Sequence, residues 1–292
     1  MISLRLIQGD CLKVLPHIKD NSVNLIFADP PFNKGKDYGE LVDDNLSTEE
    51  YFSWCEKWIS LCFQKLIDTG SIYILNNPVN TSYLKLIMDK YGILRNIIVW
   101  ILRNPTPVKQ QYPKSYLNIL FYTKTESYAF DEKAEYIPYE FKTYDTSESS
   151  IRRSKHRVYD VWTDIPKLVS GYMAQDEVLL KPLTYSKEHI MQLPEKLLKR
   201  IISHSSKPND LVLDPFVGSG TTMKSAVDLG RNCIGIDIET KSCFLTGKRL
   251  GFGFKPLGEI SKKFIQYNEE KSGLLEADWK NFSTEQRRME TL

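Results

Sequence analysis

The sequence predicts an α/β fold in which helices cover a mostly parallel β-sheet. Residues 1–122 alternate between apolar runs, which are typical of buried strands, and amphipathic helical patterns. Later in the chain an apolar run leads into a glycine-containing turn at 214–220, which a helical pattern follows. A second apolar run then ends in Asp237. A strand, a tight turn and a helix start in this order are typical of nucleotide-binding α/β units.

Apolar periodicity and turn residues define the individual elements. The predicted strands are residues 2–8, 23–28, 71–75, 96–102, 116–122, 211–213 and 233–236, and the predicted helices are about 11–18, 47–67, 81–90, 194–204 and 238–250. In the longest helix Ser47 and Glu50 form a capping box, and Gly70 is expected to end it. Trp54 and Trp58 recur at helical spacing, which indicates core packing rather than a base-stacking surface.

The composition is that of an ordinary globular protein. The chain has 292 residues, enough for one or two domains, with 41% hydrophobic and 26% charged residues. A net charge of +2 permits nucleic-acid binding without demanding it. The five cysteines are scattered, which predicts reduced thiols, and the four dispersed histidines argue against a structural metal. No apolar run is long enough to cross a membrane, so a cytoplasmic location is expected.

The first candidate binding site is the turn Asp214-Pro215-Phe216-Val217-Gly218-Ser219-Gly220-Thr221. It is not a P-loop, because no Lys-Ser or Lys-Thr pair is placed to hold a triphosphate, and it does not match G-x-G-x-x-G. Backbone N–H groups at a helix start suit a small polar ligand, and an acidic residue at 237 suits the hydroxyl pair of a ribose. The two interpretations are an adenosine-type ligand and a plain structural turn.

A second motif, Asp29-Pro30-Pro31-Phe32, ends the strand at 23–28. Alone it indicates only a loop. Together with D-P-F-x-G-S-G-T-T at 214–222, it resembles the catalytic and cofactor motifs of the amino DNA methyltransferases, which methylate exocyclic nitrogens. The catalytic motif comes first, an order similar to that of the β group of this family. Shorter matches at 9–11, 160–162 and 189–194 extend the resemblance over most of the chain.

The resemblance implies a Rossmann-like, seven-stranded methyltransferase sheet with a circularly permuted sequence. It also implies S-adenosylmethionine as the cofactor and double-stranded DNA as the substrate. The chain would then comprise a catalytic half (1–123), a target-recognition region (124–187), a cofactor-binding half (188–253) and a polar, peripheral tail (254–292). A second copy of the chain and a cognate restriction endonuclease are candidate partners.

Each motif residue has an implied role. Asp29 and the Pro30 carbonyl would accept hydrogen bonds from the target NH₂ and expose the nitrogen lone pair, so that no cysteine nucleophile is needed. Pro31 would help to fix the loop, and Phe32 would offer a face to a flipped base. The implied cofactor-binding residues are Asp10, Cys11, Asp214, Phe216, Gly218, Ser219, Gly220, Thr221 and Asp237. Asp10 also fits the N-cap of the helix that follows it.

Two polar segments have open interpretations. Residues 33–45 follow the catalytic motif and read either as a lid or as a solvated connection. A basic run in the target-recognition region is followed by two aromatic residues, which favours contact with DNA phosphates and bases over a solvated charged loop. The basic residues of this run are Arg152, Arg153, Lys155 and Arg157.

The sequence therefore predicts methylation of adenine N6 in DNA. An Asp at position 29 resembles the adenine enzymes, whereas cytosine-N4 enzymes of this group more often carry Ser, so cytosine-N4 methylation is the alternative. A non-catalytic DNA-recognition subunit with the same fold is a further alternative, against which both intact motifs speak. A protein glutamine methyltransferase fits poorly, because that class carries Asn before the prolines and has an unpermuted order.

Overall fold

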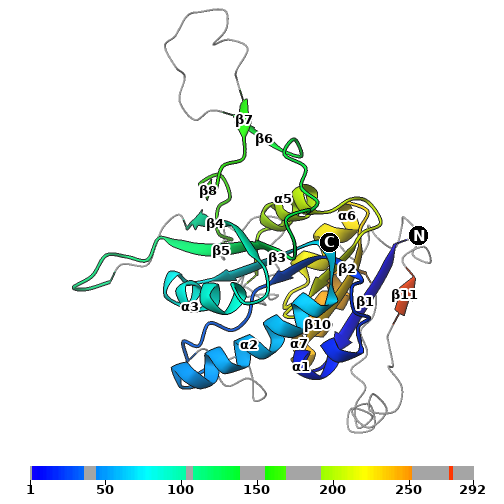
Figure 1. Cartoon of the computed structure of the whole chain (residues 1–292), viewed down its shortest axis with the longest axis horizontal. Helices are drawn as coiled ribbons and strands as arrows, with labels where there is room; N and C mark the ends of the chain where they lie inside the picture. The colour runs from blue at the N-terminus through cyan, green and yellow to red at the C-terminus, as the bar shows by residue number, and fades with distance from the viewer. Residues whose placement is uncertain are drawn as a thin grey trace, which may run out of the picture.

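The computed structural model describes residues 2–35, 44–102, 108–138, 155–168 and 192–251, together with the backbone of 276–278. These residues form a large sheet with the strand order β11-β1-β10-β9-β2-β3-β5-β4-β8 (Figure 1). Its strands are β1 (Ser3–Gln8), β2 (Val23–Ala28), β3 (Leu66–Asn76), β4 (Ile93–Ile101), β5 (Tyr116–Thr123), β8 (Val161–Trp162), β9 (Leu211–Asp214), β10 (Asn232–Asp237) and β11 (Glu276–Asp278). The helices are α1 (Cys11–Val14), α2 (Thr48–Lys65), α3 (Pro78–Met88), α5 (Glu195–Ser205), α6 (Thr221–Asp228) and α7 (Thr240–Arg249).

The sheet is mostly parallel, as the sequence predicts. β1, β10, β9, β2 and β3 are parallel neighbours, whereas β5 runs antiparallel to both β3 and β4. β4 and β5 follow one another in the chain and pair with each other as an antiparallel hairpin. The seven strands from β1 to β4 are the predicted methyltransferase sheet. Two short strands extend its edges: β8 from the predicted target-recognition region and β11 from the tail.

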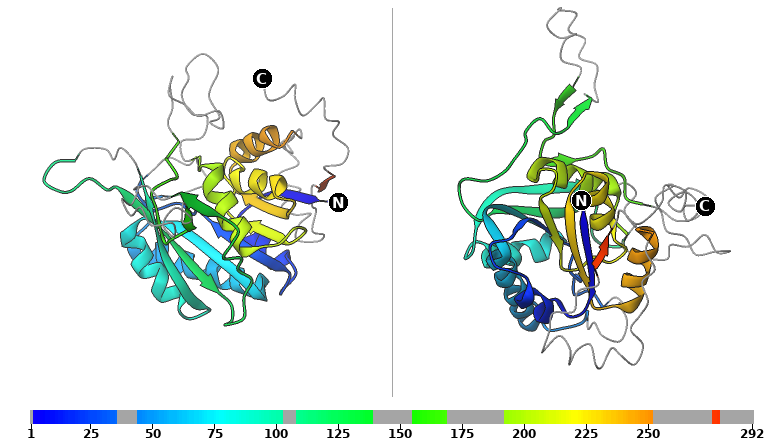
Figure 2. Two further views of the ribbon diagram at one scale, coloured as in Figure 1. Left: turned by 90° about the horizontal axis from the view of Figure 1, so that it is seen from above. Right: turned by 90° about the vertical axis from the view of Figure 1, so that its right-hand side faces the viewer.

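The strands separate two apolar cores, one on each face of the sheet. In β2, Leu25 and Phe27 face the core shared with α5 and α6, and Ile26 and Ala28 face the core shared with α2 and α3. Figure 2 shows these two pairs of helices on opposite faces of the sheet. Trp58 of α2 is fully buried in the second core, so the core-packing prediction for the tryptophan stripe is confirmed. Among the described helices, none has the length and apolar character needed to cross a bilayer.

The capping box of α2 is confirmed. The Glu50 N–H donates to Ser47 Oγ at 3.2 Å, and the Ser47 N–H donates to the Glu50 carboxylate at 3.1 Å. The predicted end of this helix is wrong, because α2 ends at Lys65 and Gly70 lies inside β3. A Cβ at Gly70 would lie 3.1 Å from the Asn24 carbonyl of β2, so the glycine permits a close approach of two strands.

Two other helices differ from prediction at a proline. The helix predicted at 11–18 is α1, which continues as a 3₁₀ turn at Leu15–His17 because Pro16 supplies no N–H for an α-helical bond. α3 begins at Pro78, earlier than predicted, with Asn77 as its N-cap. Proline is well placed in the first turn of a helix, where its missing N–H has no intrahelical acceptor.

Candidate active site

Four strand ends bring the predicted motifs together. β1, β10, β9 and β2 are consecutive parallel strands, so their carboxyl ends lie at the same edge of the sheet (Figure 1). Asp10 follows β1, Asp237 ends β10, Asp214 ends β9 and Asp29 follows β2. In open α/β sheets, ligands bind in the crevice beyond these ends. The fold thus places the catalytic motif beside the cofactor motif.

Two glycines permit the tight turn between β9 and α6. Gly218 and Gly220 have φ angles of 53° and 79°. These values lie in the left-handed region, which residues with a Cβ rarely adopt. A Cβ at Gly220 would also lie 2.8 Å from the Thr246 side chain of α7. The turn therefore needs glycine at position 220 for both its conformation and its packing.

Two backbone N–H groups of this turn donate hydrogen bonds within the protein and so do not point to a ligand. The Gly218 N–H donates to Asp237 Oδ2 at 2.8 Å, and the Gly220 N–H donates to a carbonyl within the turn at 2.9 Å. The predicted contact with a cofactor carboxylate therefore rests on Ser219 and Thr221. Thr221 is the first residue of α6, where an N–H has no intrahelical acceptor and the helix dipole favours an anion.

Asp237 braces the glycine turn. Its carboxylate accepts the Gly218 N–H and, at 2.9 Å, the N–H of Glu239. Burial raises the pKa of this carboxyl to about 6. The Ser242 side chain also bonds to it. A carboxylate offers about four acceptor sites, so a ribose hydroxyl could be a further partner. The ribose contact stays a prediction.

Asp214 lies beneath the turn, almost fully buried. It accepts the Phe216 N–H at 2.9 Å, and the Thr222 side chain also bonds to it. Burial raises the pKa of this carboxyl to about 7. The position of Asp214 is that of a support for the turn, so its predicted role in cofactor binding is indirect.

Asp214→Asn is expected to stabilise the protein more at pH 8 than at pH 5. The carboxyl pKa rises from 3.8 to about 7 on folding. The native state therefore binds more protons between these values, and the free energy of unfolding falls as the pH rises through that window. Above it, the buried carboxylate costs roughly 4 kcal/mol, which an uncharged amide oxygen avoids while still accepting the Phe216 N–H. Thermal unfolding at the two pH values measures the difference; an equal change in Tm at both would contradict the prediction.

Asp10 is the N-cap of α1, because its Oδ1 accepts the Leu12 N–H at 2.9 Å. This confirms the helix-cap interpretation and leaves the adenine contact a prediction. The Cys11 side chain is buried in the core beneath α2, and burial raises the pKa of its thiol. Only the backbone of Cys11 is therefore available to a ligand in this conformation.

Phe216 is held by two aromatic side chains that the sequence did not assign to the site. Its ring centroid lies 5.7 Å from that of Trp54 and 5.1 Å from that of Trp58, the latter with edge-to-face geometry. Such pairs prefer edge-to-face or tilted arrangements at these distances. The tryptophan stripe of α2 thus packs the core and also supports a residue of the cofactor turn.

Arg249 of α7 is a further residue that sequence reasoning missed. Its side chain is only 6% exposed and forms an ion pair with Glu195 at 2.9 Å. Nη1 donates to Thr221 Oγ1 at 2.8 Å and to the Ser219 carbonyl at 3.3 Å. Arg249 therefore fixes the two turn residues on which the predicted carboxylate contact rests.

Three side chains from distant parts of the chain hold the loop that follows β2. Tyr51 Oη of α2 donates to the Pro31 carbonyl at 2.7 Å, and Asn80 Nδ2 of α3 donates to the Phe32 carbonyl at 2.9 Å. Asp44 accepts the N–H groups of the next two residues at 2.6 and 3.0 Å. The geometry of the catalytic loop is thus fixed before a substrate binds.

The ring of Phe32 is 5% exposed and belongs to one of the two cores. Lys34 Nζ lies 5.7 Å from the ring centroid. Stacking of a flipped base on Phe32, as predicted, therefore requires the groups that cover the ring to move. Most of the lid predicted at 33–45, namely residues 36–43, lies outside the described part of the chain.

The basic run lies only partly within the described residues. β6 (Tyr136–Pro138) and β7 (Lys155–Arg157) pair antiparallel as a ribbon that stands away from the sheet (Figure 1). Arg152 and Arg153 lie outside the described part of the chain, as does the side chain of Lys155. Their contact with DNA stays a prediction.

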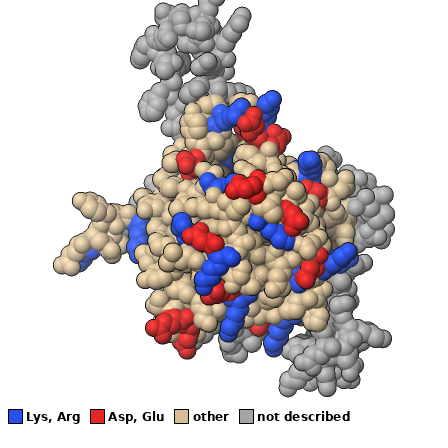
Figure 3. Space-filling view, in the orientation of Figure 1, with Lys and Arg blue, Asp and Glu red and all other residues tan. Residues whose placement is uncertain are grey.

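Arg157, the fourth basic residue, forms a bidentate ion pair with Glu132 at 2.7 and 2.9 Å. Both side chains are about half exposed, so a phosphate group would have to compete with this carboxylate. On the face shown in Figure 3, basic and acidic side chains are interspersed, and the described residues there form no continuous basic stripe. Within the same described residues, no group of three or more His, Cys, Asp and Glu side chains is placed to hold a metal ion.

Comparison with known proteins finds relatives that align with most of this chain. Type II methyltransferase M.BamHI of Bacillus amyloliquefaciens is 32% identical over 91% of this chain, which spans 61% of the relative's length. DNA adenine methyltransferase YhdJ of Escherichia coli (strain K12) is 33% identical over 94% of this chain and 92% of its own. Among solved structures, the M1.HpyAVI–SAM complex aligns with a TM-score of 0.58, 20% identity and coverage of 85% of this chain and 98% of that one.

The strand order, with the glycine turn and the Asp-Pro-Pro-Phe loop at one sheet edge, is that of the permuted methyltransferase fold. The model of the DNA methylase family N6_N4_Mtase matches residues 23–246, which is more than half of the chain. The chain belongs to that DNA methylase family.

Proposed function

We propose that this protein transfers a methyl group from S-adenosylmethionine to N6 of an adenine flipped out of double-stranded DNA. The observation that carries the proposal is the position of Asp29, which follows β2 directly beside the end of β9 and its glycine turn. The 33% identity to YhdJ, named a DNA adenine methyltransferase, supports adenine as the target. Cytosine N4 is the alternative, because the family name covers both amino groups.

The residues around the turn fit the cofactor. Two glycines in left-handed conformations bring the backbone of the turn to the start of α6, where a carboxylate is favoured. Ser219 and Thr221 would hold the carboxylate, Asp237 the ribose and Asp10 the adenine. When bound, S-adenosylmethionine supplies an electrophilic methyl group on a sulfonium.

The chain's own chemistry is to prepare the target nitrogen. An exocyclic amine is a weak nucleophile because its lone pair is delocalised into the ring. Asp29 and the Pro30 carbonyl accept hydrogen bonds from its two N–H groups, which draws the nitrogen towards a tetrahedral geometry and frees the lone pair. The bonds from Tyr51 and Asn80 to the following carbonyls keep these acceptors in place. The methylated nitrogen carries a positive charge and is therefore acidic, and it then loses one proton to water.

The partners follow from the same proposal. DNA is contacted by the basic run and by the ribbon β6–β7. Kinship with enzymes named Type II methyltransferases favours a cognate restriction endonuclease, whereas kinship with YhdJ fits a methyltransferase that acts alone. A homodimer is compatible with either arrangement, and the cytoplasm is the proposed location.

Nucleoside analysis tests the proposed reaction. The protein is incubated with labelled S-adenosylmethionine and unmodified phage DNA, and the DNA is digested to nucleosides and separated. We expect the label in N6-methyladenine, and none when DNA is replaced by protein substrates. Label in N4-methylcytosine alone would replace adenine by cytosine. Cofactor binding by calorimetry without transfer to any DNA would favour the non-catalytic recognition subunit.

A further inference from the structure

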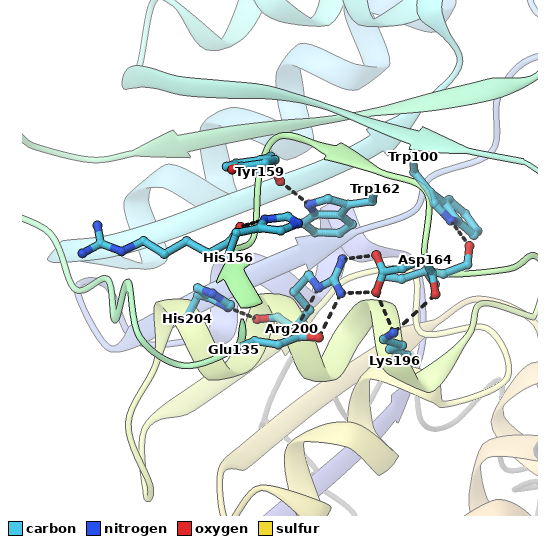
Figure 4. A network of polar contacts seen from close by, with 11 residues as sticks. Trp100, Glu135, His156, Tyr159, Trp162, Asp164, Lys196, Arg200 and His204 are labelled. Carbon is cyan, nitrogen blue, oxygen red and sulfur yellow. Dashed lines mark hydrogen bonds and ion pairs between the residues drawn. The ribbon is translucent and has the colours of Figure 1, made fainter. Parts of the chain in front are cut away.

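One buried guanidinium lies at the centre of an ion-pair cluster outside the catalytic edge (Figure 4). The Arg200 side chain, in α5, is 1% exposed. Nε and Nη2 donate to the two oxygens of Glu135 at 2.8 and 2.9 Å, and Nη1 and Nη2 donate to those of Asp164 at 3.0 and 2.7 Å. The Trp162 ring covers the guanidinium, with 5.0 Å between Cζ and the ring centroid. Two carboxylates thus share one cation, and Lys196 adds a second at 2.6 Å from Asp164.

The two carboxylates lie at the two ends of one chain segment, residues 136–163. Glu135 directly precedes β6, and Asp164 follows β8. Between them lies the segment 136–163, which contains the ribbon β6–β7 and the basic run. A single side chain of α5 therefore holds both ends of the segment to which DNA contact is assigned.

Other contacts fix the same two ends. After Asp164, the Ile165 carbonyl accepts the Trp100 Nε1–H of β4 at 2.8 Å. Before Glu135, the Asp131 N–H donates to the His204 carbonyl of α5 at 2.7 Å. The ends are thus anchored, whereas the ribbon between them stands away from the sheet (Figures 1 and 4).

The charges of this cluster contribute an effect that the packing of its side chains alone would not give. Burial works to raise the pKa of Asp164, but its bonds to Arg200 and Lys196 outweigh burial and hold the pKa at about 2. An apolar cluster of equal volume often stabilises a protein as well as a buried ion pair does. A planar guanidinium with two bidentate carboxylates differs from an apolar cluster in one respect, because it fixes direction.

We propose that Arg200 is a positioning residue for DNA recognition. By holding both ends of 136–163 against α5, it sets the direction in which the ribbon leaves the body and hence how well the ribbon meets DNA. This inference rests on the proposed contact between that segment and DNA. Arg200 itself contacts neither DNA nor the reacting atoms.

The test separates DNA capture from the chemical step. Glu135→Gln keeps the side-chain shape and removes one charge from the cluster, a milder change than substitution of Arg200 itself. We expect the KM for unmodified phage DNA to rise about tenfold, because orientation of the ribbon is lost. The kcat at saturating DNA and the Kd for S-adenosylmethionine should stay within about twofold of wild type, since the catalytic edge is not touched. A purely structural role would instead lower Tm and leave the KM for DNA unchanged.

Asp228→Asn is the matched control. Like Glu135, Asp228 pairs with a basic side chain of α5, in this case Lys199, and its side chain is 28% exposed, as is that of Glu135. Asp228 does not lie at an end of the segment 136–163. Its KM for DNA should equal that of wild type. An unchanged KM for DNA in both Glu135→Gln and Asp164→Asn would overturn the positioning role.

A third variant separates this inference from the proposal on which it depends. Arg152→Ala/Arg153→Ala/Lys155→Ala removes three of the basic residues assigned to DNA contact. A raised KM for DNA in this variant, with Glu135→Gln at the wild-type value, overturns only the positioning role. An unchanged KM in the triple variant overturns the DNA contact of the segment, and the positioning role falls with it.

Discussion

Asp29→Ala is expected to lower the rate of methyl transfer to DNA by a factor of about 10³ without loss of cofactor binding. Asp29 follows β2, and its carboxylate is the acceptor proposed for the target NH₂. Without it, the target nitrogen keeps its delocalised lone pair. The proposed cofactor residues follow β1, end β9 and β10, or lie between β9 and the first residue of α6, and the substitution changes none of them. Single-turnover transfer from labelled S-adenosylmethionine and calorimetric binding of the cofactor measure the two properties.

Two further variants make this result specific. Asp29→Asn keeps an oxygen acceptor and loses the charge, so its rate should lie between those of wild type and Asp29→Ala. Asp68→Ala removes a carboxylate that is 80% exposed and pairs with Lys124, and transfer by this variant should equal that of wild type. If Asp29→Ala kept more than a tenth of the wild-type rate, Asp29 would not be the central acceptor.

The sequence predicts those parts of the site whose residues are close neighbours along the chain. A buried strand followed directly by Asp29 or ending in Asp237 indicates where a polar group leaves a parallel sheet, and parallel strand ends share an edge. The glycines at 218 and 220 were predictable for the same reason, since the turn has to form between neighbouring elements. The capping box of α2 is equally local.

Long-range partners were not predictable in this way. Tyr51, Asn80 and Arg249 lie in amphipathic helices, where their spacing indicates only a helical face. Their hydrogen bonds to the catalytic loop and to the cofactor turn depend on how helices pack across the sheet. The reversal of β5 was missed because apolar alternation carries no strand direction. Gly70 was misread because glycine also permits a close approach of two strands.

At Phe32, the resemblance to the family predicts the kind of side chain that would contact a base, but it does not predict how deeply this side chain is buried. An aromatic residue after two prolines predicts a stacking face, yet its ring is packed into a core. The loop backbone, by contrast, is held in place by three side chains from outside the motif.

Tyr51→Phe is expected to lower kcat by about 10²-fold, because small displacements of a catalytic group have effects of this size. Tyr51 Oη donates to the Pro31 carbonyl at 2.7 Å and accepts Asn76 Nδ2 at 3.3 Å. Removing this one atom leaves the Pro31 carbonyl and the buried Asn76 amide without this partner, so the loop carrying Asp29 and the Pro30 carbonyl relaxes. The KM for S-adenosylmethionine should stay unchanged, since the glycine turn is held by other residues.

Tyr73→Phe is the matched control for this effect. Tyr73 is as buried as Tyr51 and its hydroxyl makes one hydrogen bond, to Ser205 Oγ at 2.6 Å, between β3 and α5. Both variants should lose about 1–3 kcal/mol of unfolding free energy, the cost of leaving a buried polar group unpaired. Only Tyr51→Phe should lose kcat. A similar loss of kcat in both variants would show that general destabilisation, rather than the aim of the loop, limits the reaction.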